Sequence, residues 1–182
     1  MPTMPASEFA ARFPSLFRTS AFRLETLDFY IADNEREPYR RFQSGRSQDL
    51  SWRRPWQRTV RGIRENGGGI GRVHIVPDPL TDYLRFELTC AYPASVEAGE
   101  DVRVLARASA DTLDLPDGED YWLFDDERSA LLRYAPDGEF IDVELVTDPD
   151  RVKQHAEWRH TAQAAAVPLH EYLQTAGLTP AH

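Results

Sequence analysis

The chain has 182 residues, of which 41% are hydrophobic and 28% charged, and its formal net charge is −9. This length suits one well-cored domain, and no apolar run reaches the roughly 20 residues that a membrane-spanning helix needs. The acidic balance argues against direct nucleic-acid binding, and the single cysteine, Cys90, excludes an intramolecular disulfide and a zinc site of several thiolates.

Residues 1–20 are expected to form a loose leader or a short docking helix. Phe9 and Phe13 lie at helical spacing, and such a phenylalanine-rich segment docks more often on its own domain than on a partner. The segment lacks the basic and then apolar pattern of a secretory signal, so we expect a cytoplasmic protein. The remaining chain is expected to form one globular domain over residues 21–176 and a tail over 177–182.

Two helices are predicted in the first third of the domain. Residues 37–45, EPYRRFQSG, read as a short helix that ends at Gly45. Residues 49–69 carry apolar side chains at helical spacing, Pro55 in the first turn and glycines at the end. The opposite face is basic, which suits either a solvated surface or an acidic partner. The candidate partner-binding residues are Trp52, Arg53, Arg54, Trp56, Arg58 and Arg61.

The rest of the chain alternates between strand and helix patterns. Extended segments are expected over residues 21–32, 71–77, 101–106 and 121–124, and in a hairpin over 129–146. Helices are expected over 80–92 and from 148 to a break before Pro168. We therefore predict a mixed α/β (α+β) fold with a single sheet of about five to six strands flanked by helices. The predicted core comprises Val73, Ile75, Leu84, Leu88, Val104, Leu105, Trp122, Phe124, Leu132, Val143, Leu145 and Trp158.

The stretch DYWLFDDE places acidic residues at the end of an apolar strand. Asp125 and Asp126 lie where either chain reversals or active-site residues are common. Glu144 projects from a hairpin strand, and together with His74 these residues could form a divergent metal-dependent site. A strand-borne nuclease would place a lysine just after that glutamate, where Leu145 stands. We favour the polar end of a buried strand and expect no metal ion and no cofactor.

Other catalytic motifs are missing from the sequence. The glycine run GGGIG precedes a strand, which is the wrong order for a dinucleotide or phosphate loop, and no G-x-S-x-G occurs. His155 and His160 are five residues apart and cannot form the i, i+4 zinc pair of a helix.

Several blocks of the chain resemble an uncharacterised actinobacterial family of about this length. They are PLTDYLRFE, AGEDVRVL and WLFDD, within a match from Phe22 to Leu173. The resemblance implies a small cytoplasmic protein encoded near helix-turn-helix regulators. The order of elements is also similar to one half of a phospholipase D-like domain, including versions that act as ligand sensors, but the H-x-K motif is missing at His74.

Two functions follow as expectations. The first is a non-enzymatic regulatory interaction protein that binds a helix-turn-helix transcription regulator or a small ligand. The second is a divergent metal-dependent hydrolase or nuclease on a phospholipase D-like scaffold, with His74, Asp125, Asp126 and Glu144 as its catalytic residues. Direct nucleic-acid binding and membrane association are not expected.

Overall fold

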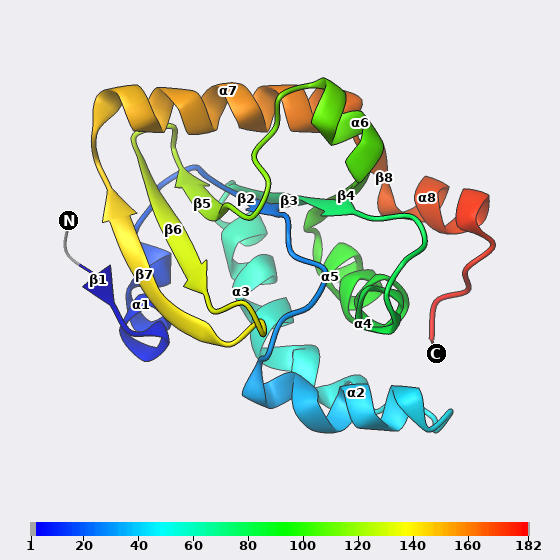
Figure 1. The fold of residues 1–182 in the computed structure, drawn as a ribbon. Coiled ribbons are helices and arrows are strands. Elements are labelled where there is room, and N and C mark those ends of the chain that lie inside the picture. The colour runs from blue at the N-terminus through cyan, green and yellow to red at the C-terminus, as the bar shows by residue number, and fades with distance from the viewer. Residues whose placement is uncertain (1–2, 182) are drawn as a thin grey trace.

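An eight-stranded sheet organises the chain in the computed structural model, which describes residues 3–181 (Figure 1). The strand order is β1-β7-β6-β5-β2-β3-β4-β8. β2, β3 and β4 run parallel to one another, and every other neighbouring pair is antiparallel. The strands are β1 (Thr3–Met4), β2 (Ser20–Glu25), β3 (Gly69–Val76), β4 (Asp101–Ala106), β5 (Asp120–Phe124), β6 (Arg128–Tyr134), β7 (Phe140–Val146) and β8 (Val167–Pro168).

Helices connect the strands and cover both faces of the sheet. They are α1 (Ala6–Arg12), α2 (Arg36–Gln43), α3 (Arg54–Glu65), α4 (Asp82–Phe86), α5 (Tyr92–Ala98), α6 (Arg107–Thr112), α7 (Pro149–Ala165) and α8 (Leu169–Ala176). A π-helical turn, Glu87–Ala91, joins α4 to α5, and short 3-10 turns occupy Phe13–Ser15, Asp33–Glu35 and Leu50–Arg53. Figure 1 shows α7 on one side of the sheet and α1, α3, α4 and α5 on the other.

The predicted fold class is confirmed, but the predicted number of strands is wrong. The sheet is mixed and is flanked by helices, as expected, yet it has eight strands instead of five to six. The additional strands are the edge strands β1 and β8, which have two residues each. Two residues show no alternation of apolar and polar side chains, so the sequence pattern could not reveal them.

The predicted core residues lie in the interior. Most are fully buried, while Leu145 and Trp158 are partly buried against the core clusters. The N-terminal segment contributes to the same interior: Met4, Phe9 and Phe13 are buried, and the ring of Phe13 lies 4.8 Å from that of Trp122 between centroids. In the described part of the chain, no helix has the length and apolar character to cross a membrane.

Candidate ligand-binding site

The four residues proposed for a divergent hydrolase do not come together. His74 of β3 lies opposite Glu25 of β2, whereas Asp125 contacts Ser20 at the other end of β2. Because Ser20 and Glu25 are five residues apart, His74 and Asp125 are separated by roughly 16 Å along the sheet. Glu144 lies in β7, and β6, β5 and β2 separate that strand from β3. In the described part of the chain, no group of three or more His, Cys, Asp or Glu residues is arranged to hold a metal ion.

Asp125 and Asp126 have structural partners in the turn after β5. Both have positive φ angles, 52° and 57°, a conformation that aspartate tolerates better than most residues. The carboxylate of Asp125 accepts hydrogen bonds from the backbone N–H groups of Arg18, Thr19 and Ser20. Burial acts to raise the pKa of Asp125, but hydrogen bonds from Thr19 and its neighbours lower that pKa to about 2. The stretch is therefore a buried strand with a polar end, as we expected.

The predicted partner-binding face divides into an outer and an inner part. Its exposed members are Arg54, Arg58 and Arg61. Its inward members are Trp52, Arg53 and Trp56. Both tryptophans were predicted to bind a partner, which requires exposure, but both are half-buried. Trp56 lies on the same side of α3 as the fully buried Val60. The ring of Trp52 stacks on Phe86, and Trp56 donates its indole N–H to Glu100.

The polar side chains of β2 and β3 are buried. Arg23 and Glu25 alternate with apolar residues along β2, and Arg72 and His74 do the same along β3. Such alternation is typical of a sheet with one face in water. Here the polar face lies beneath α3 and the α4–α5 helix pair, and Glu25, Arg72 and His74 are each less than a tenth exposed. Charged side chains of β2 and β3 therefore lie in the protein interior.

These side chains border a cavity of about 580 Å³, which we call the central cavity. It lies at the carboxyl end of the parallel strand β2, a place where open α/β sheets commonly bind ligands. Its charged and aromatic lining comprises Arg23, Glu25, Asp33, Glu35, Arg36, Arg53, Arg72, Glu87, Glu139, Tyr30, Trp56, Tyr83, Tyr92, Trp122, Tyr134 and Phe140.

Two arginines on the floor of the central cavity are paired with carboxylates. Arg72 contacts Glu100 at 2.6 Å and Glu25 at 3.0 Å, and Arg23 lies 3.0 Å from the other oxygen of Glu25. Burial acts to raise the pKa of Glu25, but the charges of Arg23 and Arg72 outweigh this effect and hold that pKa well below its ordinary value. Glu25 is therefore ionised, and it positions both guanidinium groups.

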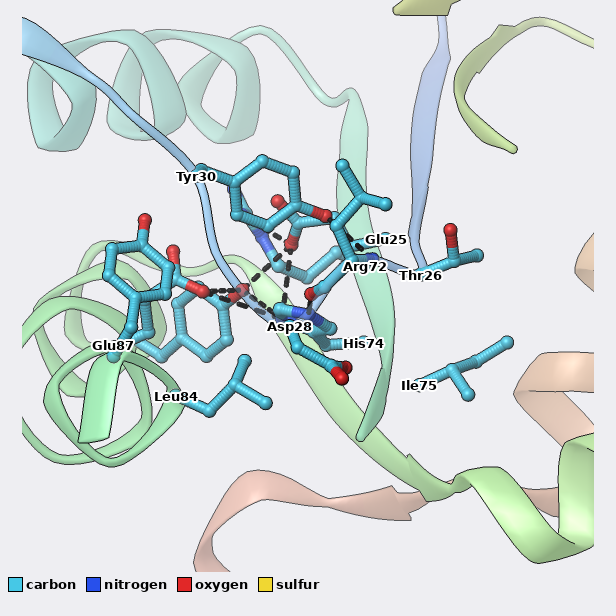
Figure 2. A network of polar contacts seen from close by, with 12 residues as sticks. Glu25, Thr26, Asp28, Tyr30, Arg72, His74, Ile75, Leu84 and Glu87 are labelled. Atoms are coloured by element: carbon cyan, nitrogen blue, oxygen red, sulfur yellow. Dashed lines mark hydrogen bonds and ion pairs between the residues drawn. The ribbon is translucent and has the colours of Figure 1, made fainter. Parts of the chain in front are cut away.

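The hydroxyl group of Tyr92 contacts three polar side chains at one side of the cavity. Figure 2 labels these three, Glu25, His74 and Glu87, which point toward one another. The tyrosine oxygen lies 2.7 Å from His74 Nδ1, 2.8 Å from Glu25 and 3.2 Å from Glu87. Because His74 Nε2 lies 2.9 Å from the carbonyl oxygen of Leu27, which only accepts, that nitrogen carries a proton. Burial lowers the pKa of His74, which favours the neutral ring, so its Nδ1 and the Glu25 carboxylate are both acceptors for the one hydroxyl proton of Tyr92.

Glu87 is the third neighbour of the Tyr92 hydroxyl. Burial raises the pKa of Glu87 well above its ordinary value, and the charges of Glu25 and Glu35 add to the effect. Tyr92 has only one proton to donate, which goes to Glu25 or His74, and a protonated carboxyl on Glu87 donates a second hydrogen bond to the tyrosine oxygen.

A proline explains how Glu87 and Tyr92 meet. Five residues along a regular α-helix turn a side chain by about 140° from its starting direction, which would separate the two. Pro93 has no N–H to donate to Thr89 four residues earlier, and the turn before it is π-helical. The carbonyl oxygen of Thr89 instead accepts a hydrogen bond from the backbone N–H of Ala181. A proline within a helical pattern was thus a sequence signal for this side of the site.

Arg53 differs from the two paired arginines. It is 9% exposed, lines the cavity and donates one hydrogen bond, 2.7 Å long, to the hydroxyl of Ser95. Its Nε has no hydrogen-bond partner among the described residues, and no carboxylate oxygen there lies within ion-pair distance of its guanidinium. Burial and the nearby charge of Arg72 lower the pKa of Arg53.

A second polar cluster, on the other face of the sheet, has the residue types of a hydrolytic triad. The Ser129 hydroxyl lies 2.7 Å from His155 Nδ1, and His155 Nε2 lies 2.9 Å from Glu119. Both Ser129 and His155 are completely buried, and the imidazole stacks on Tyr121. A substrate cannot reach this hydroxyl, so the cluster fixes α7 against β5 and β6.

Comparisons with known proteins identify a family but no activity. A family model described as "Domain of unknown function (DUF6879)" matches residues 7–174. The match includes β2 to β8 and therefore the strands that carry the central cavity. No curated protein matches the chain.

Proposed function

The chain belongs to the family described as "Domain of unknown function (DUF6879)", and we propose that it is a non-enzymatic, cytoplasmic regulatory protein that binds a small ligand in the central cavity. The observation that carries this proposal is the concentration of buried charge around an open volume of about 580 Å³. Buried ion pairs contribute little to stability compared with apolar packing, so their retention around a cavity favours a binding role.

The regulatory part of the proposal rests on α3. Its inner side brings Trp56 to the cavity, and its outer side exposes Arg54, Arg58 and Arg61. A ligand that contacts Trp56 therefore acts on the same rigid element that presents a basic surface. We propose that this surface binds an acidic patch on a helix-turn-helix regulator, which agrees with the family resemblance in the sequence.

A thermal-shift screen of small molecules with a tryptophan control tests the ligand part. A ligand at about a hundredfold its dissociation constant should raise Tm by roughly 5–10 °C. Trp56→Phe should reduce this shift because it removes part of the cavity wall and the hydrogen bond to Glu100. Trp158→Phe should leave the shift unchanged, since Trp158 packs on the opposite face of the sheet.

Each variant is compared with its own ligand-free melting curve, so a change in basal stability does not enter the result. A ligand shift that Trp56→Phe leaves intact and Trp158→Phe abolishes would place the ligand elsewhere and contradict the proposal.

A further inference from the structure

We propose that Arg53 forms an anion subsite in the central cavity, where its guanidinium binds the carboxylate or phosphate group of a small aromatic ligand. This inference rests on the proposed function and specifies the chemistry of its ligand. It starts from the one arginine of the cavity wall that has no carboxylate partner among the described residues, since Arg23, Arg36 and Arg72 each have one.

Arg53 is buried, yet most of its N–H donors form no hydrogen bond with the described residues, and unpaired buried donors are unfavourable. A guanidinium group has five N–H donors, and the described residues supply one acceptor, the Ser95 hydroxyl. Its Nε is buried without a partner. Buried donors are normally satisfied, so an unsatisfied one beside a cavity indicates a partner that enters from outside the chain. A planar carboxylate or a phosphate fits the fork of a guanidinium.

Among the described residues, no acidic side chain in or beside the cavity forms an ion pair with Arg53. Glu25 and Glu100 are already committed to Arg23 and Arg72. Burial raises the pKa of Glu35 and of Glu87, which favours their uncharged forms. Glu35 is the acceptor for the Tyr83 hydroxyl, 2.7 Å away. Arg53 is therefore the one arginine of the cavity wall without an ion pair among the described residues.

Aromatic rings next to Arg53 supply the second half of the subsite. Trp56 follows Arg53 by three residues and so lies on the same side of the helix start. Its ring lies 6.0 Å from that of Trp122, which also borders the cavity. A ring held by these two indoles can direct an attached anionic group toward Arg53.

Isothermal titration calorimetry with matched probes tests the subsite. The probes are 2-naphthoate, 2-naphthyl phosphate and the neutral 2-naphthamide, which share one ring system and differ in charge. Wild-type protein should bind at least one anionic probe about tenfold more tightly than the amide, since a charge-assisted hydrogen bond is worth at least that factor. Which anion binds more tightly decides between a carboxylate and a phosphate ligand.

The matched variants are Arg53→Met and Arg54→Met. Arg53 is buried beside the cavity, whereas its neighbour Arg54 is exposed. Arg53→Met should remove the preference for the anions, and Arg54→Met should keep it. Ser95→Ala removes the hydroxyl partner of Arg53 but not its charge, and it should also keep the preference. The wild-type comparison of charged and neutral probes remains decisive if Arg53→Met does not fold.

The outcomes separate the two proposals. Equal binding of all three probes, with Trp56→Phe weakening each of them, would overturn the anion subsite and leave the cavity as a ligand site. An anion preference that survives in folded Arg53→Met would also overturn the subsite. Binding of none of the probes by the wild-type protein would count against both proposals.

Discussion

His74 is a neutral imidazole with the carboxyl groups of Glu25 and Glu87 close to its Nδ1. It is completely buried, its Nε2 donates to the Leu27 carbonyl, and its Nδ1 faces Tyr92. Removing one partner from such a network leaves a buried polar group unsatisfied, at about 1–3 kcal/mol. The individual residues of the cavity wall are therefore coupled, and a substitution at one changes the protonation of its neighbours.

The lowered pKa of His74 predicts a loss of stability in mild acid. Burial lowers its pKa in the folded protein below the unfolded value of about 6.5, so below that pH the unfolded chain binds a proton more readily. The stability that neutral His74 contributes is present above pH about 6.5 and declines as the pH falls toward the folded pKa. The slope should reach up to about 1.4 kcal/mol per pH unit. Urea unfolding at several pH values measures it.

His74→Gln should remove this part of the slope while keeping a donor for the Leu27 carbonyl. Glu87 acts in the opposite direction: its raised pKa contributes stability that is fully present below the unfolded pKa of about 4.3 and is lost as the pH rises through its folded pKa. The difference between wild-type and His74→Gln curves isolates the histidine. His160→Gln, at an exposed position, is the control and should follow the wild-type curve. Identical slopes in wild type and His74→Gln would contradict the assignment of a neutral buried imidazole.

Among the elements, α3 connects the interior with the surface. Arg54, Arg58 and Arg61 recur at intervals of four and three residues, which places them on one outer stripe, while Trp56 and Val60 face the sheet. The helical pattern in the sequence predicted this element and its two faces. It did not predict which face carries function, because a tryptophan at helical spacing looks the same whether it lines a cavity or a partner surface.

Replacement of the outer stripe should separate partner binding from ligand binding. The triple variant Arg54→Gln, Arg58→Gln and Arg61→Gln should fold with stability within about 0.5 kcal/mol per site of wild type. It should lose a helix-turn-helix regulator that tagged wild-type protein captures from host lysate, and it should keep the ligand-induced rise in Tm. A control triple at Arg12, Arg40 and Arg46, exposed elsewhere, should keep both. Capture of the regulator by the α3 triple, or its absence from the wild-type capture, would contradict the partner surface.

The sequence predicted the secondary-structure elements but not the central cavity, because the cavity depends on contacts between residues far apart in the chain. Local patterns revealed the main strands, the hairpin and the helices, since each depends on residues that are near in the sequence. The central cavity depends on Arg23, Arg53, Arg72, Glu87 and Glu100, which only the pairing of β2 with β3 and the packing of α3 and α5 bring together. In the sequence, Arg72 and Glu25 read as the solvent side of alternating strands.

For the whole molecule, the topology determines where a ligand can enter. The two parallel crossovers, from β2 to β3 and from β3 to β4, place α3, α4 and α5 on one face of the sheet, and α7 closes the other (Figure 1). The polar side chains at the carboxyl end of β2 therefore border an open volume, whereas the Ser129 and His155 cluster on the opposite face is sealed. One sheet thus carries a ligand-accessible polar network and an inaccessible one.

The four tryptophans of the chain allow the most direct test of a ligand in the central cavity. Trp56 and Trp122 line that cavity, whereas Trp158 packs on the opposite face of the sheet. We would record the indole N–H resonances of ¹⁵N-labelled protein during titration with the low-molecular-weight extract of its host, with assignments from single Trp→Phe variants. The resonances of Trp56 and Trp122 should move while that of Trp158 stays in place. Unchanged resonances for Trp56 and Trp122, or an equal shift at Trp158, would contradict a ligand site in the central cavity.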